Sequence, residues 1–250
     1  MYPSISIGPY LLQTPGLMLI LGVWAGIFLA EKEAERLSLK NDSISNLIFY
    51  SLIAGLVGAR LAFALRTPGI YFRAPLSLLA LDTTTLAPLE GLLIGIVVAI
   101  IIGQRTNLPV RITLDALAPG QAVFMIAWMT ANILSGDAFG SPTDLPWAIQ
   151  LWGESRHPVQ FYDLIMALVI LVVILQRPFK DYGTGVNFLV LVSLSALARL
   201  ITEAFRGDSL IWFGSIRAAQ LISLGLLTYT LWLIRNWSNN AESKPISLPK

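Results

Sequence analysis

A short charged motif near residue 200 carries the clearest chemistry in the sequence. Arg199, Glu203 and Arg206 stand at positions i, i+4 and i+7, which places them on one face of a helix and allows a ladder of ion pairs. Two arginines for one carboxylate leave positive charge to spare, and a guanidinium group binds phosphate through two parallel hydrogen bonds. The motif therefore predicts a phosphate-binding site, with a structural salt bridge at the end of a helix as the alternative.

The chain has one histidine, and an isolated glutamate offers a second candidate base. His157 opens an apolar segment in the run Arg-His-Pro-Val-Gln-Phe-Tyr-Asp, where it acts either as a hydrogen-bonding organiser or as a base. Glu90 opens another apolar segment, either as a favourable acidic group at a helix N-terminus or as a general base. One histidine and no cysteine cannot make a His-rich or Cys-based metal site. We therefore expect no metal and no cofactor, and any thiol in the reaction must belong to the substrate.

Further polar groups stand close to the ends of apolar segments. Arg60 precedes the end of its segment by five residues, about 7.5 Å of helix, so it either snorkels to the surface or contacts a phosphate or glycerol group. Asn132 and Asp137 flank Gly136, and Gly140 follows. The two glycines permit close approach of the backbone to a ligand, and the alternative is a helix C-terminus followed by an Asp-containing turn.

These polar groups must be positioned by a very apolar chain. Hydrophobic residues make up 55% of the 250 positions and charged residues 13%, whereas soluble domains carry about 25% charged residues. The composition predicts an all-α, polytopic membrane helix bundle with seven transmembrane helices. The expected spans are 15–30, 46–65, 90–102, 116–134, 160–175, 186–201 and 212–234. Gly55 and the Gly91 and Gly95 pair predict close contacts between helices.

The distribution of lysine and arginine between the connecting segments predicts the orientation. The segments 31–45, 103–115 and 176–184 and the residues after 234 hold ten of these residues, against four in the opposite set. Because basic residues concentrate on the cytoplasmic side, we expect the N-terminus outside, the C-terminus in the cytoplasm and the candidate groups at the outer face. We expect a single transmembrane domain over 1–237 and a polar cytoplasmic tail over 238–250. A net charge of +2 with no dense basic cluster gives no indication of a nucleic-acid partner.

In their order along the chain, these residues resemble the motifs of the prolipoprotein diacylglyceryl transferase family. The resemblance covers about residues 6–237. Its most specific parts are the H-P-x-Q-x-Y-[DE] stretch that begins at His157 and the R-x-x-x-E-x-x-R stretch that begins at Arg199. The other matching segments are 6–9, 58–60, 90–95, 115–119 and 132–140.

The resemblance implies a multi-pass enzyme of the bacterial inner membrane with its N-terminus outside. Members of this family move diacylglycerol from phosphatidylglycerol to the thiol of the lipobox cysteine in a prolipoprotein signal peptide, and they release glycerol phosphate. The implied partners are therefore phosphatidylglycerol, that signal peptide and membrane lipid. The implied catalytic residues are Glu90, His157, Arg199 and Glu203. The implied substrate-binding residues are Arg60, Asn132, Gly136, Asp137, Gly140 and Arg206.

Four positions depart from the family's motifs. Glu90 stands where the family has a histidine, and Met129 stands where it has a phospholipid-contacting arginine. Ser195 replaces a tyrosine, and Asp137 retains the acidic residue of an N-G-E motif only as aspartate. Two functions are compatible with these departures. One is an active transferase in which Glu90 or His157 helps to deprotonate the incoming thiol. The other is a catalytically reduced paralogue that binds phospholipid or a lipoprotein partner without transferring diacylglycerol.

Overall fold

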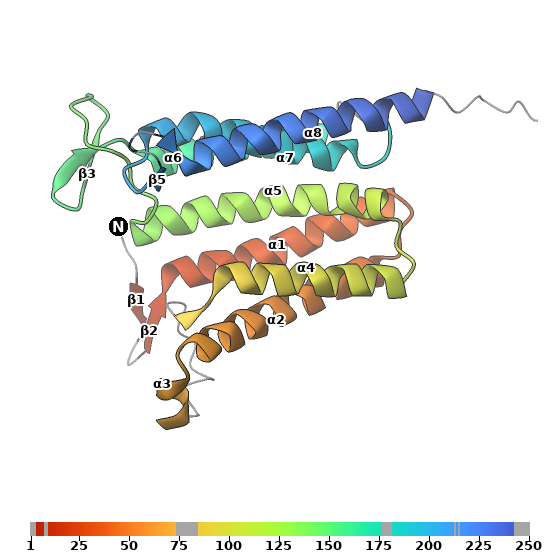
Figure 1. The fold of residues 1–250 in the computed structure, drawn as a ribbon, viewed down its shortest axis with the longest axis horizontal. Coiled ribbons are helices and arrows are strands. Elements are labelled where there is room, and N and C mark those ends of the chain that lie inside the picture. The colour runs from red at the N-terminus through yellow and green to blue at the C-terminus, as the bar shows by residue number, and fades with distance from the viewer. Residues whose placement is uncertain are drawn as a thin grey trace, which may run out of the picture. The chain divides into compact units, whose positions relative to one another are not determined.

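Apolar helices form most of the structure (Figure 1). The computed structural model describes residues 4–7, 10–73, 85–176, 182–212, 214 and 216–242. Within these residues, seven helices are long and apolar enough to cross a membrane, which confirms the predicted all-α membrane bundle. They are α1 (Thr14–Arg36), α2 (Asn41–Arg66), α4 (Pro88–Arg105), α5 (Val110–Ser135), α6 (Val159–Gln176), α7 (Val186–Thr202) and α8 (Ala218–Glu242).

Short elements connect the spanning helices. Helix α3 (Pro68–Arg73) follows α2, and the 3-10 helix η4 (Glu203–Phe205) follows α7. Three two-stranded antiparallel hairpins complete the described elements. Their strands are β1 (Ser4–Ile7) with β2 (Tyr10–Gln13), β3 (Ile149–Leu151) with β4 (Glu154–Arg156), and β5 (Ile211–Trp212) with β6 (Ile216–Arg217).

The hydropathy pattern located each spanning helix but misplaced some of their ends. Helix α1 continues past the predicted end at residue 30, because Glu33 and Ala34 are buried and the helix does not stop at its first charged residue. The last span was predicted to begin at Trp212, but that residue pairs with Ile216 in a hairpin and α8 begins at Ala218. Apolar composition alone does not distinguish a short strand from the first turn of a helix. Helix α8 extends to residue 242, and 243–250 of the predicted tail lie outside the described residues.

The chain divides into two compact units, and close helix contacts define the smaller one, Ala34–Thr113. There α2 and α4 pack side by side (Figure 1). A Cβ atom added to Gly91 would lie 2.6 Å from Cβ of Ala59 and 2.7 Å from the carbonyl oxygen of Gly55. Only glycine fits such an approach, so the predicted glycine contact between these helices is confirmed.

The larger unit consists of Met1–Glu33 together with Leu114–Lys250. Its apolar core is built by α5, α6 and α7. The fully or nearly buried members are Ala118, Ala122, Ile170, Ile174, Val186, Val190 and Leu191. A buried hydrogen bond of 2.8 Å from the hydroxyl of Ser193 to that of Thr230 joins α7 to α8. Helices α5 and α7 end, and α6 and α8 begin, close to the residues that form the candidate site.

Asp115, on α5, fixes the beginning of α7 in this unit. One carboxylate oxygen accepts a hydrogen bond of 2.5 Å from the N–H of Gly185, and the other accepts one of 3.0 Å from the N–H of Phe188. The first N–H groups of a helix have no partner within the helix, so a carboxylate supplied from a neighbouring helix satisfies them. The contact sets the position of α7 along α5.

We expect Asp115→Ala to lower the free energy of unfolding by about 0.5–2 kcal/mol, the usual cost of removing a helix N-terminal acceptor. Asp115→Asn should lose less, because its amide oxygen still accepts one of the two bonds. Unfolding of the purified protein in detergent measures both. Asp144→Ala is the control, since Asp144 is exposed. Equal stability of the Asp115→Ala and Asp144→Ala variants would show that the contact does not hold α7.

Candidate functional site

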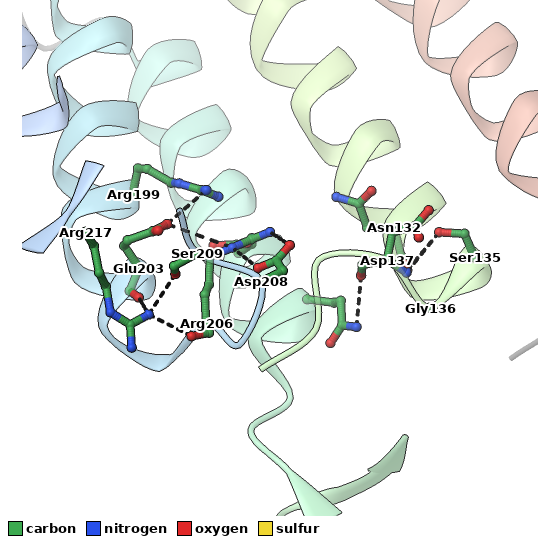
Figure 2. A network of polar contacts seen from close by, with 12 residues as sticks. Asn132, Ser135, Gly136, Asp137, Arg199, Glu203, Arg206, Asp208, Ser209 and Arg217 are labelled. Carbon is green, nitrogen blue, oxygen red and sulfur yellow. Dashed lines mark hydrogen bonds and ion pairs between the residues drawn. The ribbon is translucent and has the colours of Figure 1, made fainter. Parts of the chain in front are cut away.

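The charged motif lies where α7 ends (Figure 2). Nη2 of Arg199 lies 2.9 Å from Oε2 of Glu203, which confirms the ion pair predicted at i and i+4. The Glu203 side chain is 1% exposed, whereas that of Arg199 is 40% exposed. Arg206 does not lie on the same helix face, contrary to the prediction from its spacing. Its backbone is extended, with φ −77° and ψ 142°, because α7 gives way to a 3-10 turn at Glu203.

Arg206 is enclosed by carboxylates that come from three places in the chain. Its Nη1 lies 3.1 Å from Oδ2 of Asp163 on α6. Its Nε and Nη2 donate to the two oxygens of Asp208 at 2.9 and 2.7 Å, and Oε2 of Glu203 lies 3.8 Å from Nε. The arginine and Asp163 are both buried. Folding therefore supplies acidic partners for the positive charge that the isolated motif leaves unbalanced.

The burial of these pairs predicts unequal costs for removing the two aspartates. Asp163 is buried, whereas the side chain of Asp208 is 30% exposed. We expect Asp163→Ala to cost about 1–3 kcal/mol of stability, because a buried donor of Arg206 loses its charged partner. Asp208→Ala removes a more exposed pair and should cost about 0–1 kcal/mol. Thermal unfolding of both variants in detergent measures the difference, and a larger loss for Asp208→Ala would contradict the assignment.

Arg217 closes the turn between α7 and α8, a role that the sequence did not indicate. Its Nη1 donates to the carbonyl oxygens of Glu203 and Arg206 at 2.5 and 2.6 Å, and to the hydroxyl of Ser209 at 2.7 Å. Figure 2 shows its side chain reaching across from the start of α8. A cation at the C-terminal end of a helix is favourable, and here it also satisfies carbonyl groups that the helix leaves unpaired. The one signal in the sequence that singled out Arg217 was that it lies inside the predicted apolar span 212–234.

The loop after α5 is tied to this turn by its backbone. The N–H of Ser141 donates to the carbonyl of Phe205 at 2.8 Å, and the N–H of Gly207 donates to that of Phe139 at 2.9 Å. Gly140 forms an isolated bridge with Arg206. A Cβ atom on Gly140 would lie 2.2 Å from the carbonyl oxygen of His157. The expected close approach at Gly140 is thus to the protein's own backbone.

The end of α5 contributes polar groups to the same region (Figure 2). Gly136 has a left-handed φ of 82° and ends the helix, with its N–H donating to the carbonyl of Asn132 at 2.9 Å. The carbonyl of Asp137 accepts a hydrogen bond of 3.1 Å from the buried carboxamide of Gln160. Among the described residues, the carboxamide of Asn132 has no hydrogen-bond partner. It is therefore available to a ligand.

His157 lies between this loop and α6. Its ring centroid is 5.2 Å from that of Phe205 and 6.4 Å from that of Tyr162. Its backbone N–H donates to the carbonyl of Ser141 at 3.0 Å. Within the described part of the chain, the buried Nδ1 atom has no hydrogen-bond partner. The backbone of His157 thus holds the loop against α6, and its role as organiser or base stays a prediction.

Two of the predicted site residues belong to the smaller unit. Arg60 donates to the carbonyl oxygen and the hydroxyl of Thr85. Glu90, in the first turn of α4, is paired with Arg66 at the end of α2, a partner that the sequence did not identify. Both residues therefore help to join α2 to the beginning of α4.

Comparisons with known proteins show which family this chain belongs to. The family model described as prolipoprotein diacylglyceryl transferase matches residues 3–235. A phosphatidylglycerol–prolipoprotein diacylglyceryl transferase of Clostridioides difficile is 28% identical over 91% of this chain and 93% of its own length. Proteins of the same name from Lactobacillus acidophilus and Trichormus variabilis are 25% and 26% identical, over 93% and 91% of this chain and 89% and 86% of their own lengths. The match extends from the first hairpin to the last helix, so this multi-pass membrane protein belongs to the prolipoprotein diacylglyceryl transferase family.

Proposed function

We propose that this protein transfers diacylglycerol from phosphatidylglycerol to the thiol of the lipobox cysteine in a prolipoprotein signal peptide, at the outer face of the bacterial inner membrane. Its family and the names of its relatives support both substrates. The structural observation that carries the proposal is the half-exposed guanidinium of Arg199 beside the buried carboxylate of Glu203. An arginine held in this way is suited to a phosphate group.

The two arginines of the motif have different roles in this proposal. The donors of Arg206 are engaged by Asp163 and Asp208, so this residue positions the turn rather than binding lipid directly. Among the described residues, Arg199 pairs only with Glu203, through Nη2, which leaves Nε and Nη1 for the phosphate. Glu203 holds the guanidinium in place, and the carboxamide of Asn132 supplies a further polar contact.

The reaction requires one bond to form and one to break. The thiolate sulfur of the lipobox cysteine forms a bond to the glycerol carbon of diacylglycerol, and the bond from that carbon to the phosphate oxygen breaks. Glycerol phosphate leaves with the electron pair, and Arg199 stabilises the negative charge that develops on it. The thiol proton passes to a base, for which Glu90 and His157 are the candidates. A thiol with a pKa of about 8.5 needs only modest assistance to ionise near neutral pH.

Transfer of labelled diacylglycerol from phosphatidylglycerol to a lipobox peptide tests the proposal directly. The purified protein should release glycerol phosphate in equal amount, and the gene should rescue a bacterium depleted of its own transferase. A protein that binds phosphatidylglycerol but does neither would instead be the catalytically reduced paralogue. Phosphatidylcholine as donor is the control, because it tests whether the headgroup matters.

The orientation at the membrane gives an independent prediction. The basic residues divide ten to four, which predicts that the loops that follow α2 and α5 lie outside. Alkaline phosphatase fused within 66–88 or 141–158 should therefore be active, and the same enzyme fused within 103–115 should be silent. Activity of the last fusion would reverse the orientation and place Arg199 at the cytoplasmic face.

A further inference from the structure

A groove runs along one face of α7 and ends at Arg199. Its cavity volume is about 300 Å³, and side chains of α5, α7 and α8 line it. The wall formed by α7 extends from Phe188 to Arg199, and the facing walls include Met125 on α5 and Leu226 on α8. The side chains that form most of the wall are apolar: Met125, Phe188, Leu191, Val192, Ala196 and Leu226.

The length and the charge of the groove fit one kind of occupant. Arg199 follows Phe188 by eleven positions, which corresponds to about 16.5 Å along a helix. The hydrocarbon core of a bilayer is about 30 Å thick, so this length is close to the depth of one leaflet. Arg199 is the charged residue of the wall, and it stands at one end. A phosphate with one acyl chain beneath it matches both features.

We propose that this groove holds one acyl chain of the phospholipid donor while Arg199 holds its phosphate, and that Ser195 sets the acyl-chain volume the groove accepts. The inference rests on the proposed function, because it places the chain of the same lipid whose headgroup Arg199 binds. It adds a binding site for the apolar part of the substrate and a residue that determines specificity.

Ser195 is suited to this role by its size and position. It lies four residues, about one helical turn, before Arg199. Its hydroxyl donates to the carbonyl of Leu191 at 2.7 Å and lies 3.5 Å from the sulfur of Met125 on α5, so the two side chains touch and line the same part of the groove. Because the hydroxyl is already bonded to its own helix, the residue presents a small side chain to the occupant. A large residue here would fill the groove next to the phosphate site.

The test compares lipids that share a headgroup and differ in chain length. Wild type and Ser195→Phe compete for dioleoyl- and dioctanoyl-phosphatidylglycerol in detergent, and mass spectrometry of the intact complexes gives the ratio bound. Ser195→Phe should shift the ratio toward the short lipid about tenfold, the low end of what a hydrophobic pocket achieves for one methylene. Ser195→Ala, which removes only the hydroxyl, should leave the ratio unchanged.

Two further variants distinguish an effect of filling the groove from a general loss of folding. Leu197→Phe places the same phenylalanine side chain on α7 at an exposed position outside the groove and should keep the wild-type ratio. Val192→Phe fills the groove one turn deeper and should shift the ratio in the same direction as Ser195→Phe, which keeps the test decisive if Ser195→Phe does not fold.

The outcomes also separate this inference from the proposed function. Unchanged lipid ratios in both groove variants, with headgroup binding still dependent on Arg199, would overturn the groove and leave the function intact. A raised KM for the lipobox peptide without a change in the lipid ratio would assign the groove to the peptide and would also overturn it. A chain-length shift in a protein that transfers no diacylglycerol would support the groove and refute the transferase.

Discussion

Arg199→Ala is expected to lower the rate of diacylglyceryl transfer about 10²–10³-fold, the usual cost of removing one donor that stabilises charge in a transition state. The physical reason is that Arg199 combines an exposed guanidinium with a fixed orientation, since the buried carboxylate of Glu203 holds its Nη2. Arg199→Lys keeps the charge but loses the planar pair of donors, so it should recover only part of the activity. Initial rates with labelled phosphatidylglycerol and a lipobox peptide measure both variants.

The Arg199 experiment needs controls for charge and for folding. Arg235→Ala removes an exposed arginine from α8 and should retain wild-type activity. Arg199→Gln can still donate to Glu203, so it separates the loss of phosphate binding from the exposure of an unpaired buried carboxylate. If Arg199→Ala and Arg235→Ala are equally active, Arg199 is a structural or snorkelling residue and the phosphate site lies elsewhere.

Glu90→Gln should have the second large effect, a loss of about 10²–10⁴-fold if this carboxylate is the base that accepts the thiol proton. Glutamine keeps the size and a hydrogen-bond acceptor for Arg66 but cannot take up a proton. Glu90→His should keep part of the activity, because an imidazole is a base suited to neutral pH. The decisive measurement is kcat with a lipobox peptide across pH, for wild type and both variants.

His157 provides the comparison for Glu90. His157→Gln should change transfer little if Glu90 is the base, although it disturbs the packing against Phe205 and Tyr162. A collapse of activity in His157→Gln together with normal activity in Glu90→Gln would assign the base to the histidine. A peptide supplied already ionised, at pH above the thiol pKa, should rescue whichever variant lacks the base.

The sequence predicted the helices and the most local of the site contacts. Seven apolar stretches gave the spanning helices because lipid requires about 20 apolar residues in each. The pair Arg199 and Glu203 followed from helical spacing, and the contacts of Gly91 with α2 followed from the small-residue pattern. Helix ends were less accurate, as the hairpin at Trp212 shows, because composition does not specify where hydrogen bonding changes partner.

Helical periodicity and hydropathy, which are properties of neighbouring residues, let the sequence by itself determine the membrane bundle and the i, i+4 ion pair at the end of α7, and its motifs carried the family resemblance. Only the tertiary structure decided which arginine of the motif keeps an exposed guanidinium group. Asp163 reaches Arg206 from 43 positions away and Arg217 closes the turn from the far side of a hairpin. Such contacts depend on how helices are packed, and no local spacing encodes them. Folding thereby neutralises Arg206 with buried carboxylates and leaves Arg199 exposed at the end of an apolar groove.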